Sequence, residues 1–191
     1  IYRIRGVFSG SLSYIFNRYS KENLPFHTVL EEAMHLALTE PDLREDLSGR
    51  DVARKLLILA RELDMQVEMD DIEVESLVPE QLASIVSKED FLANSAAVNA
   101  HFQAVRDTLK QDEVLRYTGE LNVDNPRLEV KLQRVAAGSV LGTLSGSDSL
   151  FEIYTEAYGS HPLVIRGAGA GSEVTARGVF SDLLRLAASL A

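Results

Sequence analysis

The chain has no cysteine among its 191 residues. It therefore forms no disulfide, no thiolate metal site and no cysteine nucleophile. Positive charge is also scarce, because 19 Lys and Arg residues stand against 29 Asp and Glu residues, a net charge of −10. Such a chain repels nucleic acid and anionic membranes, so we expect neither as a partner. It has no apolar run long enough to span a bilayer and no visible signal peptide, and we expect a reducing, cytoplasmic setting.

The remaining composition is that of an ordinary globular protein, with 46% hydrophobic and 25% charged residues. A chain of this length can bury a core without disulfide or metal cross-links. It opens at Ile1 rather than at Met and begins at once with a strand pattern. We therefore expect a piece of a longer polypeptide, whose preceding part contributes to the active site.

The first third of the chain carries helical periodicity. Apolar residues recur three and four positions apart, Pro25 is a typical helix start, and Ser48 is the expected cap of the strongest helix. A dense group of carboxylates interrupts this pattern, and we expect it to be a loop. The expected elements are a strand at 4–8, helices at 11–21, 25–37 and 52–63, and a polar loop at 39–49.

The second half changes to alternating and clustered apolar residues between Gly, Asn and Asp breaks. This pattern is typical of antiparallel strands. The sequence thus predicts the α+β class: one domain over residues 1–191, with a mixed, largely antiparallel sheet covered on one face by helices. The expected elements are a short strand at 72–77, mostly helix at 79–110, strands at 114–123, 128–135, 150–158 and 163–166, a glycine turn at 167–171 and a last helix to about 190.

Residues 39–55 carry the most conspicuous chemistry, since five carboxylates run into a helix that bears a lysine. Asp51 and Lys55 are four positions apart and share a helix face. Carboxylates can hold a substrate ammonium group, and a positioned lysine can take the proton of a hydroxyl that is being oxidised. Taken by itself, the segment is also compatible with an exposed acidic loop and an ordinary surface ion pair.

This segment resembles the signature of homoserine dehydrogenases, T-E-P-D-P-x-x-D-L-x-G-x-D-V-x-x-K. The resemblance extends to residues 6–17 and 163–171, so it spans nearly the whole chain. At two positions the chain departs from the family: Ala37 replaces a glycine that would end a helix, and Leu43 replaces a proline that would stiffen the loop. The positions that match the signature are Thr39, Glu40, Pro41, Asp42, Asp46, Leu47, Gly49, Asp51, Val52 and Lys55.

The resemblance implies a role for several residues. Lys55 would transfer the proton and Asp51 would orient it. Glu40 and Asp46 would hold the ammonium and hydroxyl end of the substrate, and Ser11 would lie nearby. The cofactor would be NADP or NAD, bound mainly by a nucleotide-binding domain that this chain lacks. Residues 75–79 and 114–117 look like the C-terminal part of bifunctional aspartokinase–homoserine dehydrogenases.

The glycine turn and the histidines have plainer interpretations. The spacing in the turn is G-x-G-x-G, which is not a dinucleotide-binding fingerprint, and a tight structural turn accounts for it. The resemblance nevertheless implies that Gly169 contacts the cofactor. No histidine pair has metal-ligand spacing, so we expect no metal site. The histidines are His27, His35, His101 and His161.

Two functions of different class follow. The first is an NAD(P)-dependent enzyme that interconverts L-homoserine and L-aspartate 4-semialdehyde, in which the isolated chain is inactive. The alternative is a non-catalytic module that binds a substrate or effector and dimerises; a related dehydrogenase for another amino acid or aldehyde is a third possibility. We also expect a homodimer formed through the sheet, with Tyr117, Phe151 and Tyr154 on or near the face that the helices leave open.

Overall fold

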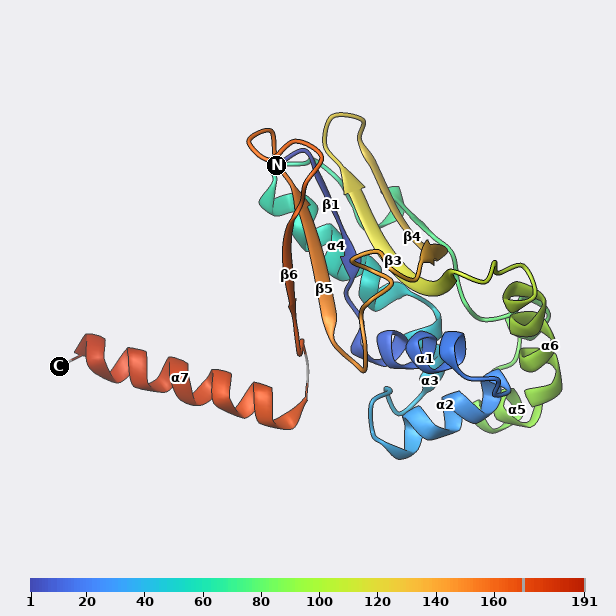
Figure 1. Ribbon diagram of the computed structural model, residues 1–191. Coiled ribbons are helices and arrows are strands. Elements are labelled where there is room, and N and C mark those ends of the chain that lie inside the picture. Colours follow the sequence, from blue (N-terminus) through green and yellow to red (C-terminus); the bar gives the residue numbers. More distant parts are fainter. Residues whose placement is uncertain (170, 191) are drawn as a thin grey trace.

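The computed structural model describes residues 1–169 and 171–190. A mixed sheet lies at its centre in the strand order β2-β4-β3-β1-β5-β6 (Figure 1). Neighbouring strands are antiparallel except β2 and β4, which are parallel. This confirms the predicted α+β class. The strands are β1 (Arg3–Val7), β2 (Ile72–Val74), β3 (Glu113–Asn122), β4 (Arg127–Ala136), β5 (Ser149–Tyr154) and β6 (Leu163–Gly167).

Helices cover one face of this sheet. Helices α1 and α4 pack directly on β3, whereas α2 and α6 lie beyond α1. An aromatic group in which Phe26 stacks on Phe102 joins these layers, and both rings are fully buried. The helices are α1 (Gly10–Lys21), α2 (Phe26–His35), α3 (Leu43–Leu47), α4 (Arg50–Glu62), α5 (Lys88–Ala93), α6 (Ser95–Arg106) and α7 (Ser172–Leu190), with 3₁₀ turns at Met69–Asp71 and Glu80–Leu82.

The polar segment 39–49 was expected to be a loop, but part of it is the helix α3. Asp42 caps the short helix α3 by accepting the Arg44 N–H, and Leu43 is buried in the core. Leu43 therefore adds hydrophobic contact where a loosened loop was expected. The predicted cap of α4 was also wrong by one residue, because Gly49 occupies that position in the left-handed conformation. Ser48 instead ends α3, and its hydroxyl donates to the Glu45 carbonyl.

The open face of the sheet is charged rather than aromatic. Alternation in β3 and β5 places Tyr117 and Phe151 on the helix-covered side, where Tyr117 is buried and Phe151 stacks on Phe8. The expectation for these two residues was therefore wrong, while Tyr154 lies on the open side beside an arginine–carboxylate pair. The ion pairs of this face are Arg3–Glu120, Arg5–Glu152, Arg127–Glu129 and Lys131–Glu129.

Helix α7 differs from the other helices, because its described side chains are exposed or half-exposed. Its apolar residues include Val179, Phe180 and Leu183. It thus adds nothing to the core of the described chain. No helix within residues 1–169 and 171–190 has the length and apolar character needed to cross a membrane.

The C-terminal end of α2 confirms the missing glycine cap. Ala37 has a φ of 52°, in the left-handed region that glycine favours. Its N–H donates to the Met34 carbonyl and the Leu38 N–H donates to the Ala33 carbonyl, which is the usual helix-ending arrangement. The helix therefore ends in its usual turn with a strained alanine in it.

Ala37→Gly is expected to stabilise the purified chain by roughly 0.5–1 kcal/mol, because it relieves left-handed strain at some cost in chain entropy. Ala100→Gly, inside the exposed part of α6, is the matched control and should destabilise by a similar amount. Urea unfolding of both variants measures the two changes. A loss of stability in Ala37→Gly would contradict the assignment.

Candidate active site

Helix α4 places two of the predicted residues in direct contact. The Lys55 ammonium group lies 2.8 Å from the Asp51 carboxylate, as their spacing on the helix predicts. It also donates to the Phe8 carbonyl at 2.9 Å, which anchors it at the end of β1. The Lys55 side chain is 47% exposed rather than buried. A lysine ammonium has three donors, so these two contacts leave one donor for a further partner.

Asp46 joins the start of α1 to the acidic segment. One of its carboxylate oxygens accepts the Ser11 hydroxyl at 2.6 Å, and the other accepts the Glu40 backbone N–H at 2.9 Å. Ser11 is in turn 2.9 Å from the Ser9 hydroxyl, and Ser9 caps α1 by accepting the Leu12 N–H. Asp46 therefore fixes both the Ser11 hydroxyl and the backbone at Glu40.

Burial is the main influence on the acidity of Asp46. It raises the pKa of the Asp46 carboxyl above its usual value, against the hydrogen bonds from Ser11 and Glu40, which lower it. Glu40 lies in a different environment, because its side chain is exposed at the rim of the site. The two acids thus provide one carboxylate held inside and one facing water.

These side chains line a single cavity of about 190 Å³. At about 30 Å³ per water molecule in the liquid, this is the space of roughly six waters, which suits a small amino acid. A second hollow of about 290 Å³ adjoins it and shares Glu40, Asp46 and Asp51. The predicted residues in the first cavity are Ser11, Glu40, Asp46, Asp51 and Lys55; its other lining residues are Ser9, Gly10, Ala37, Leu38, Ser147 and Gly171.

The glycine turn lies at the edge of this cavity and contributes Gly171 to its lining. Gly169, the predicted cofactor contact, sits against β5: a Cβ atom there would lie 2.6 Å from the Ser149 hydroxyl. Packing on Ser149 thus accounts for this glycine even without a ligand. A Cβ atom at Gly167 or Gly171 would meet nothing within 4 Å, so the turn is open on that side. Within the described residues, the only parallel strand pair is β2 with β4, so the doubly wound parallel sheet that binds dinucleotides is not present there.

Two features bear on what else the site could bind. Within the described part of the chain, no three His, Asp or Glu side chains are placed to hold a metal ion. Six lining residues were not among the predicted site residues, and two of these six carry hydroxyl groups. Ser9 stands beside Ser11 in the matched segment 6–17, which was a usable signal, whereas Ser147 belongs to a segment with no recognisable motif.

Comparison with known proteins connects this geometry to a family. The family model described as homoserine dehydrogenase matches residues 1–184. A bifunctional aspartokinase/homoserine dehydrogenase from Daucus carota is 48% identical over the whole chain, which spans 21% of that relative. A homoserine dehydrogenase from Emericella nidulans is 41% identical over 96% of the chain and 53% of its own length. A crystal structure of a Candida auris protein of unknown function superposes with a TM-score of 0.88 at 39% identity, over 98% of this chain and 53% of that one.

The raised pKa of Asp46 predicts a pH-dependent stability. An acid whose pKa is higher in the folded state stabilises the fold while it is protonated, and that contribution is lost as the pH rises above its unfolded value of about 3.9. The unfolding free energy of the wild type, relative to Asp46→Asn, should therefore fall as the pH rises from about 4 toward neutrality. Urea titrations across this range measure the difference; a constant or rising difference would refute the stated environment of Asp46.

Proposed function

The chain belongs to the homoserine dehydrogenase family, and we propose that, within its parent protein, it catalyses the NAD(P)-dependent interconversion of L-homoserine and L-aspartate 4-semialdehyde. This reaction would serve threonine and methionine biosynthesis. The chain spans about a fifth of its bifunctional relatives and about half of a single-function one. The proposal therefore concerns a parent with a nucleotide-binding domain, and we expect the 191-residue chain alone to be inactive.

One observation carries the proposal: Lys55 and the Ser11–Asp46 pair face the same small cavity. A lysine with one free donor direction suits proton exchange with an oxygen atom. The Glu40 and Asp46 carboxylates, which line the same cavity, suit an ammonium group. L-Homoserine and L-aspartate 4-semialdehyde each carry the reacting oxygen and an ammonium group in one short molecule.

Lys55 would act on the oxygen that changes from hydroxyl to carbonyl. In the direction of oxidation Lys55 would accept the hydroxyl proton, and in the direction of reduction it would return that proton to the carbonyl oxygen. The bound NAD(P) supplies the hydride acceptor or donor. Asp51 and the Phe8 carbonyl hold the amine in position, so little ordering of Lys55 remains for the reaction itself.

The acids would bind the other end of the substrate. Asp46 has both oxygens engaged, yet a carboxylate has about four acceptor positions and keeps capacity for an ammonium group. Glu40 at the rim would add a second negative charge. The Ser11 hydroxyl donates its hydrogen bond to Asp46, so its oxygen can only accept, from the Ser9 hydroxyl and from a substrate. Gly169 and its turn would approach the cofactor from the other side of the cavity.

The alternative is a module that binds substrate or effector and dimerises without turnover. Its support is the lack of a nucleotide-binding unit in the described residues. A turnover assay on the full-length parent with homoserine and NADP, or NAD, distinguishes the two. Turnover by the parent supports the proposal, and binding without turnover supports the alternative.

Lys55→Ala in the parent is expected to lower kcat by about 100-fold or more, the usual contribution of a general acid or base. Glu40→Gln should instead raise KM for homoserine with a smaller change in kcat, because it removes a charge that binds but takes no proton. Lys21→Ala, an exposed lysine at the end of α1, is the control and should leave both constants unchanged. Steady-state kinetics in both directions measures these effects. More than half of wild-type kcat in Lys55→Ala would end the assignment.

We further propose that the chain forms a homodimer through its sheet. Strand β6 is the last strand of the sheet, and its backbone has a partner on one side only. Leu163, Val164 and Ile165 are all at least 40% exposed along it. Unpaired, apolar edges of this kind pair with other chains, and closed twofold dimers are the commonest solution.

Light scattering of the purified chain at micromolar concentration is expected to give twice the mass of one chain, 21.1 kDa. Val164→Asp should shift the protein to the monomer, because a charge at the centre of β6 opposes apolar pairing. Val86→Asp is the matched control, since Val86 is exposed in a loop, and it should remain dimeric. A wild-type mass near 21.1 kDa would rule the dimer out.

A further inference from the structure

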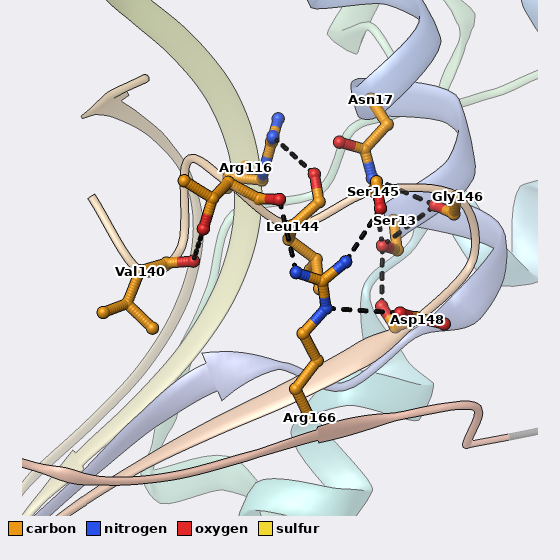
Figure 2. A network of polar contacts seen from close by, with 10 residues as sticks. Ser13, Asn17, Arg116, Val140, Leu144, Ser145, Gly146, Asp148 and Arg166 are labelled. Carbon is orange, nitrogen blue, oxygen red and sulfur yellow. Dashed lines mark hydrogen bonds and ion pairs between the residues drawn. The ribbon is translucent and has the colours of Figure 1, made fainter. Parts of the chain in front are cut away.

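The segment 141–148, between β4 and β5, has an unusual source of order. It is rich in Gly, Ser and Thr, residues typical of mobile loops, yet Leu141 and Leu144 are fully buried. Side chains from other parts of the chain bind its backbone carbonyls. Figure 2 shows this network, in which α1, β3 and β6 all contribute donors.

Helix α1 holds one side of the segment through two side-chain hydrogen bonds. The Ser13 hydroxyl donates to the Asp148 carbonyl at 2.8 Å, and the Asn17 amide donates to the Gly146 carbonyl at 2.9 Å. Both side chains are buried. Because Ser11 lies on the first turn of the same helix, the segment and the Ser11 hydroxyl have a common support.

Strand β3 supplies a buried cation. The Arg116 guanidinium donates to the carbonyls of Leu141, Gly142 and Leu144 at 2.8–3.2 Å, and the residue is wholly inaccessible to water. Burial lowers the pKa of Arg116 to about 10, so it remains a cation at neutral pH. Carbonyl oxygens thus replace the water that this charge would otherwise bind.

Strand β6 holds the outer side through Arg166. Its guanidinium donates to the Ser145 hydroxyl at 2.8 Å and to the Asp148 carboxylate at 3.2 Å, with a longer contact to the Thr143 carbonyl. Arg166 is followed directly by Gly167, the first residue of the glycine turn. One side chain therefore joins the segment to the start of that turn.

Both joined parts reach the cavity. Ser147 lines it from the segment, and Gly171 lines it from the turn. The Ser147 carbonyl is so close to α1 that a Cβ atom on Gly10 would lie 3.1 Å from it. A small displacement of the segment would therefore move one wall of the cavity against the residues that face Lys55.

We propose that Arg166 is a positioning residue, which holds Ser147 and the glycine turn at the wall of the cavity and thereby sets the affinity for the amino-acid substrate. This proposal rests on the proposed function. Arg166 touches neither Lys55 nor Asp46, so it acts on the shape of the site and leaves proton transfer to Lys55. The contacts of Ser13, Asn17 and Arg116 with the segment do not involve Arg166, so we expect the fold to survive its removal.

The test uses the full-length parent with Arg166→Ala, Arg166→Lys and Arg61→Ala. Arg61 is the matched control, because its guanidinium also joins a backbone carbonyl, that of Val67, to a carboxylate, that of Glu68, away from the cavity. Arg166→Ala should raise KM for homoserine by about 10-fold, which corresponds to a loss of about 1.4 kcal/mol of binding free energy, with a much smaller change in kcat and the same pH profile. Arg166→Lys should recover part of the loss through Asp148. Arg61→Ala should match the wild type.

Hydrogen–deuterium exchange of residues 141–150 gives a reading that does not depend on turnover. Exchange should be faster in Arg166→Ala and unchanged in Arg61→Ala. Unchanged exchange or an unchanged KM in Arg166→Ala would overturn the proposal. A fall in kcat that accompanies a loss of thermal stability would also overturn it. A wild-type parent that does not turn over homoserine would overturn the proposed function and the substrate part of this inference, while the exchange rates would still test the contact itself.

Discussion

A hydrogen bond of 2.6 Å between the Ser11 hydroxyl and the Asp46 carboxylate joins the two parts of the chain on which the site depends. Ser11 belongs to the strand–helix turn that begins at β1, and Asp46 belongs to α3 in the acidic segment. The Lys55–Phe8 contact makes a second connection between the same two regions, from α4 to the end of β1. Because both connections are made by polar groups at the cavity, the contacts that shape the site also hold its walls together.

Close packing sets where α4 can begin. Gly49 has a φ of 73°, and a Cβ atom there would collide with the Tyr117 hydroxyl, which donates to the Glu75 carbonyl beneath it. Burial raises the pKa of the Tyr117 phenol well above its usual range, so the group remains a neutral donor. Helix α4, with Asp51 and Lys55 on its first turns, thus rests on β3 through contacts that only glycine permits.

Charged side chains that lose contact with water have polar partners in this fold. The open face of the sheet pairs arginines with carboxylates across neighbouring strands, as in Arg5–Glu152, where Glu152 is 3% exposed. The buried Arg116 has no carboxylate among its hydrogen-bond acceptors in the described structure, and carbonyl oxygens alone solvate its charge. A buried charge is costly without polar partners. The need of Arg116 for these carbonyls therefore holds the 141–148 segment against the sheet.

Local features followed from the sequence, because they depend on backbone geometry within a few residues. The four-residue spacing of Asp51 and Lys55 predicted that they share a helix face, alternating apolar residues predicted β3 and β4 as antiparallel strands, and Ala37 was identified as standing where a glycine would end a helix. Helix α3 escaped prediction because five residues are too few to show a period, and Leu43 forms it by entering the core. Alternation also separates two faces of a strand without saying which face the helices cover, so Tyr117 and Phe151 were placed on the wrong side.

Ser11 and Asp46 are 35 positions apart, and Arg166 and Asp148 are 18 apart. Such distances depend on how all the layers pack together, and only the tertiary structure decided them.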